Sequence, residues 1–327
     1  MKQVIRFIVS LILSAVCLWL AFRNVDFHAA IQLLGQVNFS LIALYLLTLV
    51  FIQIVRAIRW DILIRPFVSL SKSAVFRNSN LGMMLVLVLP LRLGEFARPY
   101  MLKKEHSASL SAGLGAIVVE RTIDGLLVTL FFFVSTIIFS DNKQVPAGLH
   151  LAAVMALLFF TGALVVVVAS LLWRDLALRL LSRILHPISP KLERKLTGMV
   201  SAFVDGLRAL PDFRSVVGLF FWSLAYWGVN GAGFYWVMRA FGWSLPFTAG
   251  LTVVSIIVIA IMIPAGPGFI GTYQIGITQG LAIYGISANA AAAYGLIVYP
   301  LNILVVIAFG LPYLFMRKAN ISELIHA

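Results

Sequence analysis

The stretch LPLRLGEFAR, residues 89–98, decides the fold because proline, glycine and charge interrupt an apolar run there. Residues 75–90 are largely apolar up to the proline, and the charged residues follow at once. A second stretch, IPAGPGFIGTYQ at 263–274, repeats this pattern, since residues 247–264 run apolar into a proline and an apolar piece, 269–285, follows the break. The predicted hinge residues of the two breaks are Pro90, Gly94, Pro264, Gly266, Pro267, Gly268 and Gly271.

The composition surrounding these breaks is that of a membrane protein. Of the 327 residues, 61% are hydrophobic and 11% charged, whereas soluble domains carry about 25% charged residues. A run of about 20 apolar residues spans the hydrocarbon core. The candidate crossings are 5–22, 40–55, 109–139, 148–173, 214–238 and 288–315. We therefore predict an all-α polytopic membrane protein, a single domain over 1–327, with about six full crossings and two re-entrant hairpins.

The basic residues predict the orientation of these crossings. With the N-terminus in the cytoplasm, 21 of the 25 lysines and arginines fall on the cytoplasmic side, as the positive-inside rule requires. Arg23, Lys143 and Arg239 fall outside, and Arg121 lies in the membrane. Both termini are then cytoplasmic, in the inner membrane of a prokaryote. The net charge of +13 reflects this orientation, and we expect no nucleic-acid partner.

An internal repeat relates the two breaks. The small-residue run at 111–116 aligns with that at 290–295, and a long apolar stretch follows each. Repeat halves of about 40–139 and 214–315 would be inverted relative to each other, and paired broken segments of this kind mark transporter binding sites. Between the halves, in residues 174–213, apolar positions such as Leu192, Leu196 and Phe203 recur at helical spacing, and the polar face carries Arg194 and Lys195. They predict an amphipathic helix on the cytoplasmic surface.

Charge inside the membrane predicts the functional site, because each such residue costs about 2.5–3.5 kcal/mol and persists when it is paired or lines a polar cavity. One charged cluster follows the first break, and a second lies within the stretch 109–139, where Arg121 and Asp124 are spaced to pair. Polar residues after the second break form a third cluster. The predicted lipid head-group site is Arg92, Glu95, Arg98, Glu120, Arg121, Asp124, Tyr273 and Gln274.

Arginine and carboxylate suit a phosphate-bearing head group. Arg92, Arg98 and Arg121 would contact phosphate oxygens, since guanidinium matches them bidentately. The carboxylates would balance those arginines or bind the cationic part of a zwitterionic head group. The alternative is a buried ion network that only holds helices together. We interpret Arg56, Arg59 and Trp60 as interface anchors, and the aromatic residues Trp222, Tyr226, Trp227 and Tyr235 as packing residues.

The sequence contains no motif typical of nucleotide binding or metal-dependent hydrolysis. There is no phosphate-binding Gly-x-x-x-x-Gly-Lys-Ser/Thr loop and no His-Glu-x-x-His, and Cys17 is the one cysteine. We predict no catalytic residue, no metal and no cofactor. Two alternatives to lipid transport stay open. One is a membrane enzyme acting on a polyprenyl-linked or glycosylated lipid, with Glu95, Glu120 or Asp124 as acid or base. The other is a scaffold for a lipid-modifying complex.

Three motifs carry a resemblance to a known family: LPLRLGEFAR at 89–98, SLS at 109–111 with ERTID at 120–124, and IPAGPGFIGTYQ at 263–274. Together they resemble the lysylphosphatidylglycerol synthase transmembrane region, a flippase-like family, over about residues 5–318. The resemblance implies a fold with re-entrant segments and movement of a lipid across the cytoplasmic membrane of a bacterium or archaeon.

The resemblance also bears on partners. In full-length synthases a soluble aminoacyl-transfer domain follows the membrane region, whereas this chain ends at Ala327, so lysine transfer is not expected. Membrane lipids are the expected partners. The small-residue runs allow helix packing within one chain or between copies, which leaves a homo-oligomer or an envelope-lipid biosynthesis partner open.

Overall fold

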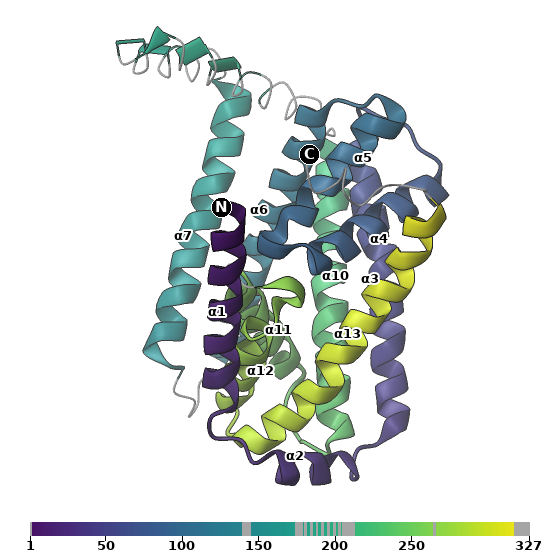
Figure 1. Cartoon of the computed structure of the whole chain (residues 1–327), viewed down its shortest axis with the longest axis vertical. Coiled ribbons are helices and arrows are strands. Elements are labelled where there is room, and N and C mark those ends of the chain that lie inside the picture. The colour runs from purple at the N-terminus through teal and green to yellow at the C-terminus, as the bar shows by residue number, and fades with distance from the viewer. Residues whose placement is uncertain are drawn as a thin grey trace.

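The computed structural model describes residues 2–138, 145–173, 213–263 and 266–316, together with scattered residues between 179 and 204. Within these ranges every regular element is a helix, and a helix covers each predicted apolar stretch, which confirms an all-α fold (Figure 1). The elements are α1 (Lys2–Phe22), α2 (Phe27–Leu34), α3 (Phe39–Ile64), α4 (Lys72–Val88), the 3₁₀ helix η1 (Pro90–Phe96), α5 (Ala97–His106), α6 (Leu110–Ile138), α7 (Ala147–Leu172), α10 (Phe213–Ala240), α11 (Phe247–Ile261), the 3₁₀ helix η2 (Pro267–Phe269), α12 (Thr272–Ala282) and α13 (Ala288–Met316).

Long helices form the frame of the bundle. Figure 1 shows α1, α3, α6, α7 and α10 running lengthwise, with α13 inclined across them and α7 at one edge. By length and apolar composition α3, α13 and residues Ala147–Ala169 of α7 qualify as membrane spans. A fourth candidate joins Leu11–Phe22 to α2 through a bend of 75°. The exact number of six crossings therefore stays a prediction.

The surface is apolar and the interior holds charge. On α7 the side chains of Leu158 and Phe159 are 63% and 64% exposed, whereas Glu120 on α6 is 1% exposed. A water-soluble protein shows the opposite arrangement, and contiguous exposed apolar surface of this kind fits contact with lipid. The main apolar core lies where α3, α4, α10, α11, α12 and α13 meet.

The first break joins α4 to α5 through η1. Leu89 is extended, and Pro90 begins the 3₁₀ helix, as expected because proline cannot continue α4 without losing a backbone hydrogen bond. Gly94 then packs against the α4 backbone, where an added Cβ atom would lie 2.1 Å from the Leu85 carbonyl carbon and from the Val86 nitrogen. Gly94 is thus required for this close approach.

The second break joins α11 to α12, and these two helices pack side by side. Pro267 begins η2, and Gly271 precedes α12 with a φ of +90°. A Cβ atom at Gly271 would lie 2.4 Å from the Ser14 carbonyl oxygen of α1. The predicted hinge Pro264 lies outside the described residues, as do Leu192, Leu196 and Phe203 of the proposed amphipathic segment.

Candidate functional site

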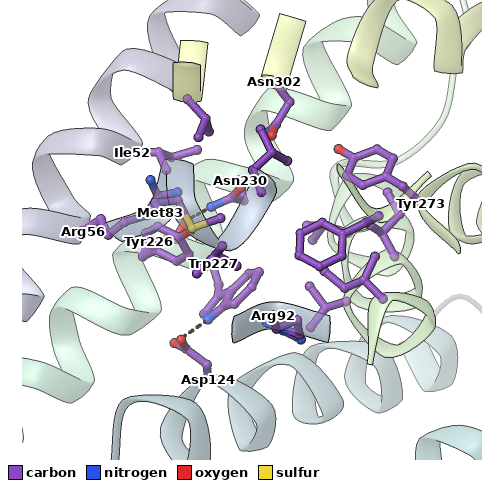
Figure 2. Close-up of a pocket in the computed structure, with 18 of the residues that line it drawn as sticks. Ile52, Arg56, Met83, Arg92, Asp124, Tyr226, Trp227, Asn230, Tyr273 and Asn302 are labelled. Atoms are coloured by element: carbon purple, nitrogen blue, oxygen red, sulfur yellow. Dashed lines mark hydrogen bonds between the residues drawn. The ribbon is translucent and has the colours of Figure 1, made fainter. Parts of the chain in front are cut away.

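A cavity of about 180 Å³ lies inside the bundle, between the two breaks and the helices α3, α6, α10 and α13 (Figure 2). It brings together all six charged residues predicted for the site, and it adds two arginines from α3. The charged lining residues are Arg56, Arg59, Arg92, Arg98, Arg121, Glu95, Glu120 and Asp124. Five arginines against three carboxylates leave a surplus of two positive charges.

Glu120 is the buried centre of one half of the charge network. Its carboxylate lies 2.9 Å from Nη2 of Arg98 on α5 and 3.0 Å from Nη2 of Arg121, its neighbour on α6. The Arg98 guanidinium also stacks on the ring of Trp60, 4.2 Å from its centroid, a favourable cation–π geometry. These contacts tie α5 and α3 to α6.

Asp124, one turn further along α6, organises the other half. Its Oδ1 accepts hydrogen bonds from Arg59 of α3 and, at 2.9 Å, from Nε1 of Trp227 on α10. Its Oδ2 lies 3.4 Å from Nη2 of Arg121, which is the predicted pairing within α6. The ion network that the sequence allowed for is therefore present, and it also lines the cavity.

Arg92 and Glu95 pair within η1, with 2.9 Å between Nη2 and Oε1. Glu95 thus faces Arg92, while Arg98 on α5 pairs with Glu120 instead. Arg92 has a φ of +59°, as Phe269 in the second break has one of +57°. The Arg92 guanidinium lies 5.5 Å from the centroid of the Phe269 ring. Two backbone positions unfavourable for residues other than glycine thus meet at the cavity.

The interpretation of Arg56, Arg59 and Trp60 as interface anchors is wrong. They are 7%, 1% and 0% exposed, because α3 runs on to Ile64 and turns this face inward. The pattern that could have revealed them is the spacing of Gln53, Arg56 and Arg59, which places three polar residues on one side of an apolar helix.

Two aromatic residues of α10, which we interpreted as packing residues, also contact the charged residues of the cavity. The Tyr226 hydroxyl accepts a hydrogen bond of 3.2 Å from Arg56, and the Tyr226 ring lies 4.8 Å from the guanidinium of Arg59. Trp227 donates to Asp124, as Figure 2 shows. No local pattern distinguishes these two residues from the other aromatic residues of α10.

The two residues predicted for the site after the second break, Tyr273 and Gln274, have different roles in the structure. Tyr273 on α12 lines the cavity. Gln274 does not, because its Oε1 accepts a hydrogen bond of 2.7 Å from the backbone nitrogen of Gly271 and so caps α12. Gly268 contributes to the cavity wall, whereas Gly94 and Gly271 pack against neighbouring helices.

Comparison with known proteins identifies the family of the chain. Two archaeal relatives are described as UPF0104 membrane proteins. The one from Methanothermobacter thermautotrophicus is 23% identical over 95% of this chain and 92% of its own length. The one from Methanocaldococcus jannaschii is 21% identical over 72% of this chain and 95% of its own length. Residues 7–310 match the lysylphosphatidylglycerol synthase TM region. This range includes both breaks and all the charged residues of the cavity. The chain belongs to this family of integral membrane proteins.

Proposed function

We propose that this protein is a lipid transporter that moves a lipid with an anionic head group across the cytoplasmic membrane of a prokaryote. The observation that carries the proposal is the surplus of two positive charges, from five arginines against three carboxylates, in a cavity inside an apolar bundle. An uncompensated charge in such a place is costly. A phosphate group in the cavity would offset it.

The arginines retain donors for such a group. The Nε atoms of Arg59, Arg92 and Arg121 are buried and have no hydrogen-bond partner in the described part of the chain. A buried donor without a partner costs about 1–3 kcal/mol, so the site gains when an acceptor enters. Phosphate oxygens are the acceptors that guanidinium groups match best.

Aliphatic side chains form another part of the cavity wall. Leu87 of α4, Val254 and Ile257 of α11, and Ile303 and Val306 of α13 line it. A lipid presents the same combination of charged head group and apolar chain. The joint presence of arginines and aliphatic side chains therefore supports a lipid rather than a free phosphate ion.

We further propose that α1, α3, α6, α7, α10 and α13 cross the membrane, with α4–α5 and α11–α12 as re-entrant hairpins of an inverted repeat. At 1.5 Å per residue, the six helices of 21–29 residues extend about 31–44 Å. That exceeds the hydrocarbon core of about 30 Å. The 15 residues of α11 reach only about 22 Å.

Reporter tags at each end of the chain test this topology. Both tags are expected in the cytoplasm, because six crossings return the chain to the side on which it starts. The first residues of α1 and the last of α13 lie toward the same end of the bundle in Figure 1, which supports this expectation. Tags found on opposite sides would contradict it.

Acid–base catalysis on a lipid is the alternative that the same cavity could serve. Each of its carboxylates, Glu95, Glu120 and Asp124, is engaged in an ion pair with arginine. That arrangement suits a fixed electrostatic site better than a group that must gain and lose a proton. Chemical conversion of a lipid by the purified protein would favour the enzyme.

Replacing Arg56 by glutamine tests the transport proposal with little risk to the fold. Among the described residues, Arg56 hydrogen-bonds only the neutral side chains of Gln53 and Tyr226, so no described carboxylate loses its counter-charge. A hydrogen bond to a charged group is worth about 1.5–3 kcal/mol. We therefore expect translocation of a fluorescent anionic lipid in proteoliposomes to slow about ten- to hundredfold.

The matched control is Arg65→Gln, near the Ile64 end of the same helix, where the arginine side chain is 69% exposed. It is expected to leave translocation unchanged. Anionic-lipid movement at the wild-type rate in the Arg56 variant, or no movement by the wild type, would overturn the proposal.

A further inference from the structure

We propose that Gln53 and Tyr226 are positioning residues, which hold the guanidinium of Arg56 in place without neutralising its charge. They would thereby keep one full positive charge of the cavity available to an anionic ligand. The inference rests on the proposed function and deepens it, since it assigns this role to two neutral side chains, one on α3 and one on α10. Figure 2 shows Arg56 beside Tyr226, on the side of the cavity opposite to Tyr273.

The charge pattern of the cavity distinguishes Arg56 from the other four arginines. Each of those four forms at least one ion pair, and the pairs are Arg59 with Asp124, Arg92 with Glu95, Arg98 with Glu120, and Arg121 with both Glu120 and Asp124. Arg56 forms no ion pair with a carboxylate in the described part of the chain. Because it is only 7% exposed, Arg56 is a buried charge without a described counter-charge.

Two neutral oxygen atoms take the place of a carboxylate at Arg56. Its Nη1 donates a hydrogen bond of 2.5 Å to Oε1 of Gln53, and its Nη2 donates one of 3.2 Å to the hydroxyl of Tyr226. The two acceptors come from different helices and engage different nitrogens, so they restrict rotation of the guanidinium plane. A guanidinium carries five N–H donors, so donors remain for a ligand.

Both acceptors are fixed by contacts of their own. Gln53 is 2% exposed and donates from Nε2 to the Leu49 carbonyl at 3.1 Å, which turns its side-chain oxygen toward Arg56. The ring of Tyr226 lies 4.8 Å from the guanidinium of Arg59, a favourable cation–π distance. A charged group held in this way binds a ligand without first losing conformational freedom.

Gln53→Glu tests the inference, because it gives Arg56 a counter-charge at the position of its present acceptor. The unfolding temperature without lipid should not fall below that of the wild type, since the new carboxylate compensates a buried charge. The apparent affinity for short-chain phosphatidic acid should nevertheless fall about ten- to hundredfold, because Arg56 is then neutralised by the protein instead of the ligand. Both are measured in detergent from the unfolding temperature, which a bound ligand raises. Wild-type affinity in this variant would overturn the inference.

Tyr226→Phe tests the same role without adding a charge, since it removes the hydroxyl acceptor and keeps the ring beside Arg59. We expect a loss of affinity of about two- to tenfold in the wild-type background. In the Arg56→Gln background the same substitution should have no further effect, because residues that act through one another are not additive. Equal losses in the two backgrounds would show that Tyr226 does not act through Arg56, and would overturn its positioning role.

Matched controls place the same two substitutions outside the cavity lining. Gln32→Glu adds a carboxylate at an exposed position of α2, and Tyr235→Phe removes a hydroxyl from α10. Neither should change the affinity for phosphatidic acid. A loss in Gln32→Glu as large as that in Gln53→Glu would show a general charge effect and overturn the inference.

Diacylglycerol with the same acyl chains separates this inference from the proposed function, because it lacks the phosphate. The wild type should bind and move phosphatidic acid in preference to diacylglycerol. No preference in binding, and no movement of either lipid in proteoliposomes, would refute the proposed function and the inference that rests on it. A wild type that prefers and moves phosphatidic acid, with a Gln53→Glu variant that does so equally well, would refute the inference alone.

Discussion

Glutamine in place of Glu120 is expected to abolish lipid translocation and to lower the free energy of unfolding by about 3–5 kcal/mol, the usual result of breaking a buried ion pair. Glu120 is 1% exposed and lies within 3.0 Å of two arginine Nη2 atoms, those of Arg98 and Arg121. Neutralising the carboxylate leaves Arg98, itself 5% exposed, without a counter-charge. Unfolding in mixed micelles measures the stability, and fluorescent-lipid movement in proteoliposomes measures the function.

A double variant separates loss of fold from loss of function. Arg98→Gln combined with Glu120→Gln removes both charges, and replacing a buried pair as a whole costs far less than removing one partner. We expect the double variant to recover most of the lost stability and none of the translocation. Normal translocation in the single variants Glu120→Gln and Arg98→Ala would contradict a role for this pair in transport.

Asp124→Asn is expected to lower the free energy of unfolding by a similar amount, about 3–5 kcal/mol. Asp124 on α6 binds residues of α3 and α10 and so connects three helices. It accepts hydrogen bonds from Arg59 on α3 and Trp227 on α10 and lies close to Arg121 on α6. Asparagine can still accept the indole N–H, but it no longer compensates Arg59, which is 1% exposed. Translocation should fall with the stability, since the same residues line the cavity.

The matched control for this substitution lies on α3. Asp61 also pairs with an arginine, Arg65, but at the surface, where the Arg65 side chain is 69% exposed. Exposed pairs contribute about 0–1 kcal/mol, so Asp61→Asn should change the unfolding free energy by no more than that. Equal losses in the two variants would show that burial does not set the value of these ion pairs.

Local sequence signals were sufficient to predict the positions of the helices and of the two breaks. Long apolar runs predicted the positions of α1, α3, α6, α7, α10 and α13. Proline and glycine predicted where α4 and α11 end, because proline removes a backbone donor and glycine permits the close backbone contact seen at Gly94. The charge of 92–98 and 120–124 likewise predicted residues that share one cavity, since charge in an apolar run needs compensation.

Partners distant in sequence could not be predicted in the same way. Arg59 and Trp60 lie near the cytoplasmic end that the sequence assigned to their apolar stretch, and only the packing of α3 against α6 and α10 shows that they are buried. Gln274 follows Tyr273 directly, yet one caps a helix and the other faces the cavity. Such differences depend on side-chain direction in the assembled bundle, which composition and spacing leave undetermined.

The pairing of Arg59 with Asp124 also sets an order of events during biosynthesis. The two residues are 65 positions apart, so at about 5–20 residues per second the ribosome delivers Asp124 roughly 3–13 s after Arg59. Until then Arg59 is without its carboxylate partner, and an unpaired arginine at the centre of a membrane helix costs about 2.5–3.5 kcal/mol. We therefore expect α3 to gain its full stabilisation only after α6 has been synthesised.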